Sequence, residues 1–400
     1  MKTTEEKRIL LLVDDDAENI RIVNSILGDK YKLRVAKDGF KALELARAEP
    51  LPGLILLDVI MPNMDGYEVC SHLKSDPKTR DIPVIFLTGK TQVADETRGF
   101  EAGAVDYIHK PFSPPIMTAR VRTQLMLREA HETVARQLMA INKELELARK
   151  VQLSILPREV PRLPGLEIAA RYLPMSSVAG DFYDFFGIDQ EHFGVLIADV
   201  SGHGLSAALI ASMLQTAFAA QRPHASDPAQ VLWGLNQALY GKFQEHFVTA
   251  AYLFVDIQKN TASYAGGAHP PLLHWHAATG EAVEYEENGL MLGPFSDSNY
   301  STATFSLEKG DRIVLFTDGI VEAINSSGDQ FGMDRLKRIL ESKHDLSASR
   351  FADALLYQLS DWSEHAIGTS QTDDLTLLTI DFKAEQTSIR LDLQAAGFSG

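Results

Sequence analysis

The stretch ILLLVDDD, residues 9–16, decides the fold of the first part of the chain. Its five apolar residues predict a strand buried on both faces, as in a parallel sheet, and three acidic residues follow the strand directly. Comparable apolar runs end at Asp58 and Thr88, and a shorter stretch, residues 106–109, precedes Lys110. Open parallel sheets bind ligands beyond the carboxyl ends of their strands, so these polar residues are expected to share one site.

These motifs resemble the receiver domain of two-component response regulators, over residues 7–125. The matching strings are VDDD, LLDVIMPNMDGYE, LTG and DYIHKPF. The resemblance implies a doubly wound parallel five-stranded sheet in which Asp58 accepts a phosphoryl group. It also implies a Mg²⁺ ion bound by Asp14, Asp15, Asp58 and the backbone carbonyl of Ile60. Such an ion prefers oxygen ligands and neutralises the charge of a phosphoryl group in transfer.

The same resemblance gives three further residues a role around the phosphoryl group. Lys110 would pair with the phosphoryl oxygens as a point charge. Thr88 would donate its hydroxyl to them, and Tyr107 would be the switching aromatic residue, although an ordinary half-buried strand residue is the alternative for Tyr107. The resemblance also implies a cis peptide bond between Lys110 and Pro111.

Residues 126–156 predict a helical linker. Helix formers dominate this segment, and residues 117–156 contain neither glycine nor proline. Residues spaced alternately by four and three positions form the a/d repeat of a coiled coil: Val134, Leu138, Ile141, Leu145, Ala148, Gln152 and Ile155. Gln152 is its single polar interruption. We expect a homodimer through this helix; a helix packed only against its own domains would show the same spacing.

Residues 157–383 alternate strands and helices less regularly, with glycine-rich turns. This pattern predicts an α+β fold, a layered β-sandwich flanked by helices, rather than a second doubly wound sheet. Expected strands include residues 194–198, 249–255, 312–316 and 375–380, and expected helices include 205–220, 228–240 and 333–340. Residues 384–400 carry no motif and stay unassigned.

Four aspartates of this segment stand at expected strand ends or turns, beside small residues: Asp181 in AGDFYD, Asp199 in ADVSGHG, Asp318 in TDGIVEA and Asp373 in TDDLT. Glycine next to an acid lets a cation or a phosphate approach the backbone closely. Several carboxylates in one site repel one another unless a cation neutralises them. The sequence therefore predicts one or two Mg²⁺ or Mn²⁺ ions at an oxygen-rich site.

The set resembles the metal-dependent serine/threonine phosphatases of the type 2C (PPM) class, in the bacterial branch that controls partner-switching sigma regulators. The matching strings are VAGDFYDFF, IADVSGHGLSAAL, FVTAAYLFVD, AGGAHPPLL, GDRIVLFTDGIVEA, FGMDRL and DDLTLL. The resemblance implies two metal ions held by the four aspartates, with Asp199 as the bridge and the Val200 carbonyl as a backbone ligand. A metal-bound water would then attack the phosphorus in line.

The chain departs from the pattern of that branch at a few positions. Ala179 replaces the first of two glycines before Asp181, and Ala268 stands where relatives have glycine before His269. Arg171 is a weak candidate for the phosphate-binding arginine of eukaryotic relatives. His203 is either a proton donor to the leaving serine or a structural residue.

Two functions of different classes follow. In the first, a histidine kinase or a phosphotransfer protein loads Asp58 and thereby controls a phosphatase that acts on a phosphoserine or phosphothreonine protein, by resemblance an anti-sigma-factor antagonist. In the second, the phosphatase-like domain is a non-catalytic adaptor that binds a regulatory partner. Retention of all four aspartates favours the enzyme.

Composition and charge exclude several other classes. The net charge of −16 lies in residues 157–400, whereas residues 1–125 carry −1 and residues 126–156 carry +1. This acidic excess argues against nucleic-acid binding. A single cysteine, Cys70, excludes a disulfide scaffold and cysteine-clustered metal sites. No membrane-spanning apolar run and no signal peptide are recognisable, so we expect a cytoplasmic protein.

Overall fold

The computed structural model describes residues 7–89, 99–175, 178–243, 245–286, 288–364 and 373–383. The unassigned segment 384–400 lies outside these residues. The chain divides into two compact units, residues 1–141 and 142–400. The long helix α5, Pro114–Ile155, supplies its first turns to the core of one unit and its last turns to the core of the other. No helix in the described part of the chain has the length and apolar character that crossing a bilayer requires.

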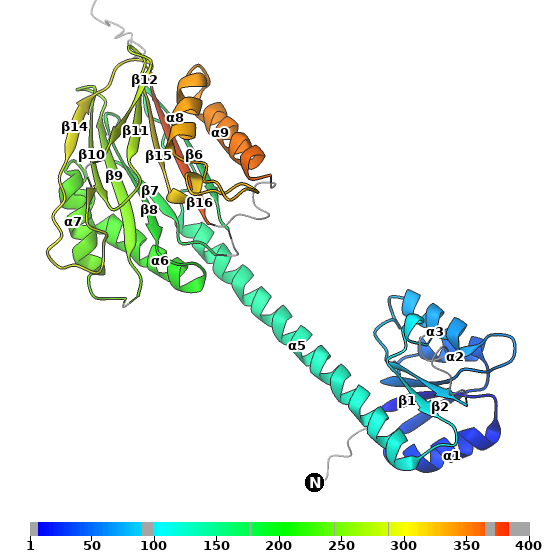
Figure 1. The fold of residues 1–400 in the computed structure, drawn as a ribbon. Helices are drawn as coiled ribbons and strands as arrows, with labels where there is room; N and C mark the ends of the chain where they lie inside the picture. The colour runs from blue at the N-terminus through cyan, green and yellow to red at the C-terminus, as the bar shows by residue number, and fades with distance from the viewer. Residues whose placement is uncertain are drawn as a thin grey trace, which may run out of the picture. The chain divides into compact units, whose positions relative to one another are not determined.

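The first unit, drawn in blue and cyan in Figure 1, contains a parallel sheet. Its strand order is β2-β1-β3-β4-β5. Its strands are β1 Ile9–Val13, β2 Lys32–Ala36, β3 Leu54–Asp58, β4 Val84–Thr88 and β5 Asp106–His109. Helix α1, Ala17–Leu27, and the start of α5 cover one face. Helices α2, Gly39–Ala46, and α3, Gly66–Ser75, cover the other. The predicted doubly wound sheet is confirmed.

Side chains of β1 alternate between these two covered faces, which explains its unbroken apolar run. Leu10 and Leu12 pack with α1 and α5, whereas Leu11 and Val13 pack with α2 and α3. An aspartate stands at the N-cap of helices α1, α2 and α3. Its carboxylate accepts a hydrogen bond from a backbone N–H of the first turn, which has no partner within the helix. Asp16 caps α1 in this way, and Asp65 forms a capping box with Glu68 at the start of α3. The three acidic residues after β1 thus have different roles, since Asp16 caps α1 whereas Asp14 and Asp15 belong to the predicted site.

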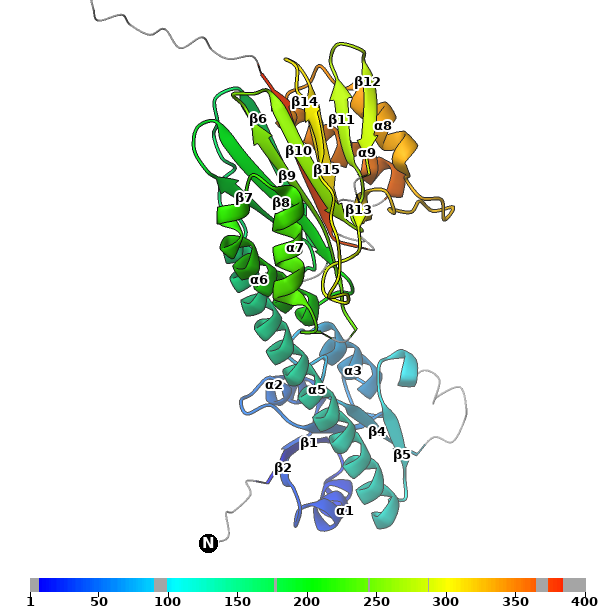
Figure 2. The same cartoon turned by 90° about the vertical axis from the view of Figure 1, so that its left-hand side faces the viewer.

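The second unit is a sandwich of two sheets between two pairs of helices (Figures 1 and 2). One sheet has the order β13-β10-β9-β8-β7, with β14 beside β10, and the other has the order β12-β11-β15-β16-β6. The strands are β6 Leu166–Leu173, β7 Phe182–Gly187, β8 His192–Val200, β9 Val248–Asp256, β10 Thr261–Gly267, β11 Leu272–His276, β12 Glu281–Tyr285, β13 Asn288–Gly289, β14 Ala303–Ser306, β15 Arg312–Phe316 and β16 Leu375–Phe382. The layered α+β architecture predicted from the sequence is confirmed.

Helices cover the outer face of each sheet. Helices α6, Leu205–Ala220, and α7, Pro228–Leu239, pack on the first sheet, and α8, Met333–Ser342, and α9, Ala348–Ser363, pack on the second. Strand β15 shows how the layers fix its register: Ile313 and Leu315 point between the sheets, and Val314 and Phe316 point toward α8 and α9. A slip by one residue would exchange the two faces, so the residue that follows the strand is placed reliably.

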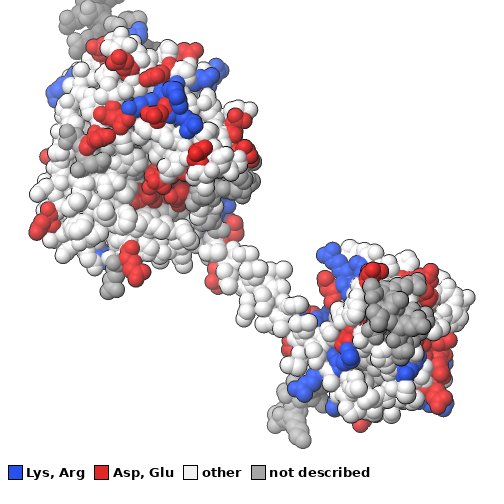
Figure 3. Space-filling model, in the orientation of Figure 1, with Lys and Arg blue, Asp and Glu red and all other residues white. Residues whose placement is uncertain are grey.

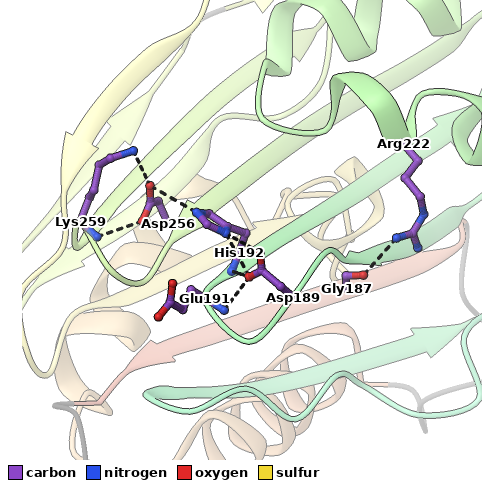
Figure 4. Close-up of polar contacts among 7 residues, drawn as sticks. All are labelled: Gly187, Asp189, Glu191, His192, Arg222, Asp256 and Lys259. Atoms are coloured by element: carbon purple, nitrogen blue, oxygen red, sulfur yellow. Dashed lines mark hydrogen bonds and ion pairs between the residues drawn. The ribbon is translucent and has the colours of Figure 1, made fainter.

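The turn between β7 and β8 is held by a polar network at the end of the hairpin opposite Asp181 and Asp199. Asp189 accepts the backbone N–H groups of Glu191 and His192, each at 2.8 Å, and lies 2.8 Å from the His192 ring. This contact raises the pKa of His192 and lowers that of Asp189. Figure 4 shows the network and its neighbours: Gly187, Asp189, Glu191, His192, Arg222, Asp256 and Lys259.

Candidate functional sites

Strand pairing brings the four predicted phosphatase aspartates to one end of the sandwich. Phe182 of β7 lies opposite Ala198 of β8, so Asp181 and Asp199 are neighbours at the same end of the first sheet. Phe316 of β15 lies opposite Leu377 of β16, which places Asp318 and Asp373 at one end of the second sheet. The two sheets meet there through direct hydrogen bonds.

Asp181 makes those bonds. Its Oδ2 accepts the hydroxyls of Thr317, at 2.8 Å, and Thr376, at 2.5 Å, both from the second sheet. Asp181 is 2% exposed, and burial followed by the nearby Asp199 carboxylate raises its pKa well above the ordinary range. The two hydroxyls fix one carboxylate oxygen, so the orientation of this side chain is set before any ligand arrives.

The other carboxylates share the same unfavourable environment. Burial, followed by repulsion from Asp318 and Asp373, raises the pKa of Asp199 to about 7. Burial and then Asp373 raise the pKa of Asp318 to about 6. The face of this unit drawn in Figure 3 carries a patch of acidic side chains. Carboxylates that raise one another's pKa in this way suit a divalent cation, which would remove the repulsion.

Two of these groups are in direct contact, since the Asp199 carboxyl forms a side-chain hydrogen bond with Asp181. Among the described residues, no three of the four aspartates have oxygens that all lie within 4.8 Å of one another. The set fits divalent cations by its chemistry, because buried carboxylates that repel one another are the oxygen ligands that Mg²⁺ and Mn²⁺ prefer.

The loop before Asp181 is anchored by Asp374, the second aspartate of the TDDLT string. Asp374 accepts the backbone N–H of Met175 at 2.7 Å and that of Gly180 at 2.6 Å. A Cβ atom on Gly180 would lie 2.7 Å from the carbonyl oxygen of Val200, so only glycine fits there. The two adjacent aspartates, Asp373 and Asp374, are visible in the sequence. The hydrogen-bond partners of Asp374 are not, because they lie almost two hundred residues away.

Two residues at or beside the positions that depart from the family pattern are buried. Ala179 is completely buried, so its methyl group has a place in the core. His269 is 2% exposed, contacts the Thr249 hydroxyl at 2.9 Å, and has a pKa lowered to about 3 by burial. It is therefore neutral and enclosed. His203 is exposed, on the loop between Val200 and α6.

Arg171 is engaged away from the acids. Its guanidinium pairs with Asp353 of α9 at 2.8 Å and donates to the carbonyl and hydroxyl oxygens of Ser349. Arg171 therefore links β6 to α9. Because its guanidinium is engaged there, these contacts argue against Arg171 as a phosphate ligand.

A second group with ligand-like spacing is His274, His276 and Asp311. It lies at the beginning of β15, whereas Asp318 follows the end of that strand. The Asp311 carboxylate already accepts His274 Nε2, at 2.9 Å, and the backbone N–H groups of Ala277 and Glu308, also at 2.9 Å. These hydrogen bonds account for the group as an anchor between β11 and β15.

In the receiver unit, Asp14, Asp15 and Asp58 come together at the carboxyl ends of β1 and β3, with oxygens within 4.8 Å of one another. Asp14 and Asp58 are buried and Asp15 is exposed. Lys110 Nζ lies 3.0 Å from Asp14 and 2.8 Å from Asp58. Burial raises the pKa of Asp58 although Lys110 opposes the shift. The three carboxylates fit a Mg²⁺ ion by their chemistry, and the Lys110 ammonium group contacts two of them.

The remaining residues that the receiver resemblance singles out lie on β4, on β5 and in the loops after β3 and β5. Thr88 is buried at the end of β4, one residue beyond Leu87, the register partner of Asp58. Tyr107 is half-buried on β5, with the Arg120 guanidinium 5.2 Å from its ring centre. The Ile60 side chain is exposed, and its backbone forms a hydrogen bond with Asp58. The peptide bond between Lys110 and Pro111 is cis, as the resemblance implied.

Comparison with known proteins agrees with both units. The family model described as the response regulator receiver domain matches residues 10–122, and the model described as stage II sporulation protein E (SpoIIE) matches residues 189–383. The phosphoserine phosphatase RsbU of Bacillus subtilis is 32% identical over 260 residues, which are 64% of this chain and 75% of RsbU. The chain belongs to the SpoIIE/RsbU family of PP2C-type phosphatases. Its phosphatase domain is joined to a receiver domain.

Two further likenesses concern parts of this chain. The SiaA-PP2C domain of Pseudomonas aeruginosa shares its fold, with a TM-score of 0.56 and 24% identity, over 62% of this chain and all of that domain. A probable cyclic di-GMP phosphodiesterase of Vibrio cholerae is 44% identical over 128 residues, 32% of this chain. The chain spans only 29% of the length of that relative, so the activity of that relative as a whole is not carried over.

Proposed function

We propose that the chain is a metal-dependent protein serine/threonine phosphatase that phosphorylation of Asp58 controls. The observation that carries the proposal is the set of aspartates from both sheets that raise one another's pKa at one end of the sandwich. The likeness to RsbU, whose name is phosphoserine phosphatase, supports the same chemistry. The fold itself contributes rigid strand ends that hold these acids.

The metal ligands would be Asp181, Asp199, Asp318, Asp373 and the Val200 carbonyl. Bound Mg²⁺ or Mn²⁺ supplies an acidified water and stabilises charge on the phosphoryl oxygens. The chain supplies the orientation. Thr317 and Thr376 hold one oxygen of Asp181 and thereby set the orientation of its carboxylate. Asp374 keeps the preceding loop against the Val200 carbonyl.

The receiver would take its phosphoryl group from a histidine kinase or a phosphotransfer protein, with Mg²⁺ bound by Asp14, Asp15 and Asp58. Lys110 contacts both Asp14 and Asp58, so its ammonium group is already where the charge of a phosphoryl group would develop. Thr88 is within one residue of the Asp58 register and would donate its hydroxyl.

The substrate would be a phosphoserine or phosphothreonine protein, and the likeness to RsbU favours an anti-sigma-factor antagonist. We also propose that the active form is a homodimer through α5. Within the heptad, Val134, Leu138 and Ile141 are 61%, 57% and 53% exposed. The later heptad residues are more buried, so the exposed part of the repeat, before Leu145, is the part that we propose as the dimer contact.

The test is phosphate release from a phosphoserine protein in the presence of Mn²⁺. We expect activity from the wild type, and loss of activity on addition of EDTA and in the Asp199→Ala and Asp318→Ala variants. Equal phosphate release by all three proteins would favour the adaptor function instead. For the receiver, acetyl phosphate should label the wild type and not Asp58→Asn; labelling that survives this substitution would contradict the role of Asp58.

A further inference from the structure

Gln152 occupies an unusual position in α5. It falls in the heptad where apolar residues are expected, and it is 6% exposed. Its side-chain amide pairs with both backbone groups of one residue in another segment: Nε2 donates to the Ala179 carbonyl at 2.5 Å, and Oε1 accepts the Ala179 N–H at 3.0 Å. A buried glutamine with both its donor and its acceptor engaged by one residue holds that residue in position.

Ala179 begins the loop that carries Asp181. The next residue, Gly180, donates its N–H to Asp374 at 2.6 Å and runs so close to Val200 that a Cβ would lie 2.7 Å from the Val200 carbonyl oxygen. The loop is therefore held from two directions, by α5 through Gln152 and by the start of β16 through Asp374. Asp181 lies two residues beyond Ala179, so a displacement of Ala179 moves a proposed metal ligand.

We propose that Gln152 is a positioning residue of the metal centre, and that its pairing with Ala179 makes the affinity of the centre for divalent cations depend on the register of α5. The inference rests on the proposed metal-dependent function. It goes further because it names the side chain through which the helix acts on the site.

The geometry permits the pairing in one register only. A slide of an α-helix by one residue moves a side chain by about 1.5 Å along the axis and turns it by about 100°. Hydrogen bonds tolerate a few tenths of an ångström, so such a slide breaks both contacts. The Ala179 N–H and carbonyl would then be buried without a partner, which is unfavourable, and the loop would have to move. The C-terminal end of α5 would thus have two states, one with Gln152 hydrogen-bonded to Ala179 and one without these bonds.

Thermodynamic linkage makes the coupling reciprocal. If pairing favours cation binding, cation binding must favour pairing to the same extent. Mn²⁺ should therefore slow hydrogen exchange at the Ala179 amide in the wild type. This measurement needs no substitution and no turnover.

The experiment compares four full-length proteins: the wild type, Gln152→Leu, Gln152→Glu and, as the matched control, Gln137→Glu. Gln137 is exposed on the same helix. Leucine removes both hydrogen bonds and fits the heptad, and glutamate keeps an acceptor for the Ala179 N–H but loses the donor to its carbonyl. Calorimetric titration with Mn²⁺ should give a dissociation constant roughly tenfold higher for both Gln152 variants, within the usual range of coupling, and no change for Gln137→Glu.

Phosphate release supplies a second measurement. The half-saturating Mn²⁺ concentration should rise by the same factor, whereas kcat at saturating Mn²⁺ stays close to that of the wild type. A purely structural role would lower the unfolding midpoint in EDTA and leave the Mn²⁺ affinity of the folded protein unchanged. Unchanged affinity in both Gln152 variants overturns the inference. If circular dichroism shows that Gln152→Leu is unfolded, Gln152→Glu decides alone.

The two proposals fail in different ways. A wild type that binds Mn²⁺ and releases phosphate, with Gln152 variants that behave like it, overturns the positioning role and leaves the phosphatase intact. A wild type with no Mn²⁺ uptake overturns both.

Discussion

Replacing Asp199 with asparagine should stabilise the metal-free protein while destroying its metal centre. The structure raises the pKa of Asp199 from the ordinary 3.8 to about 7, through burial and then through Asp318 and Asp373. Each tenfold change in proton affinity corresponds to about 1.4 kcal/mol, so charging Asp199 in the fold is unfavourable by on the order of 4 kcal/mol. The amide side chain of the Asp199→Asn variant has no charge to accommodate, and functional sites commonly carry such a penalty.

The pH dependence has a definite sign. Between about pH 4 and pH 7 the native carboxyl holds its proton more tightly than the unfolded one, so the stability of the metal-free wild type falls as the pH rises through this window and is level above it. The advantage of Asp199→Asn should therefore be largest at about pH 8, approach 4 kcal/mol there, and shrink to about 2 kcal/mol near pH 5. Saturating Mn²⁺ should reverse the order, because only the wild type binds the ion tightly.

Urea unfolding in EDTA, followed by tryptophan fluorescence, measures this effect in the full-length protein. All three tryptophans, Trp233, Trp275 and Trp362, belong to the phosphatase unit, so the signal reports that unit alone. The matched control is Asp345→Asn, outside the acid cluster and near α9, which should change stability little at either pH. Equal stability of the wild type and Asp199→Asn at pH 8 would refute the electrostatic reasoning.

Three further predictions concern other parts of the chain. Gly180→Ala should abolish tight Mn²⁺ binding in calorimetry and lower the free energy of unfolding by about 1–3 kcal/mol, because the added methyl group would clash with the Val200 carbonyl oxygen. Wild-type Mn²⁺ affinity in this variant would show that the loop can move to accommodate the methyl group. His192→Asn should lower the unfolding midpoint more at pH 5.5 than at pH 8.5. The contact with Asp189 raises the pKa of His192 in the folded protein, so its stabilising effect is complete below the pKa of the unfolded state and is lost as the pH rises through the pKa of the folded state. An equal loss at both pH values would contradict the contact with Asp189. Leu138→Glu should convert a dimer to a monomer in light scattering, whereas the exposed Gln137→Glu should not; a dimer that persists in Leu138→Glu would remove α5 as the interface.

The local sequence determined most of the fold. Leu10 to Val13 are all apolar because both faces of the sheet are covered, and this signal is complete within the strand itself. The long helix is equally local, since it depends on helix formers and on the absence of glycine and proline. The acids were recognisable because each lies within two residues of a strand end, and parallel or hairpin pairing then brings strand ends together.

The tertiary structure decided what the polar residues around those acids do. Asp374 anchors a loop 194 residues away, Arg171 fixes α9, and Gln152, a polar interruption in the heptad by sequence, turns out to hold Ala179. No periodicity records these partners, because a carboxylate, a guanidinium or an amide has the same local signature whether its partner is a metal, a phosphate or a backbone group. Only the packing of the two sheets and the end of α5 selects among those partners, since burial makes each unpaired polar group unfavourable and leaves one arrangement that satisfies them.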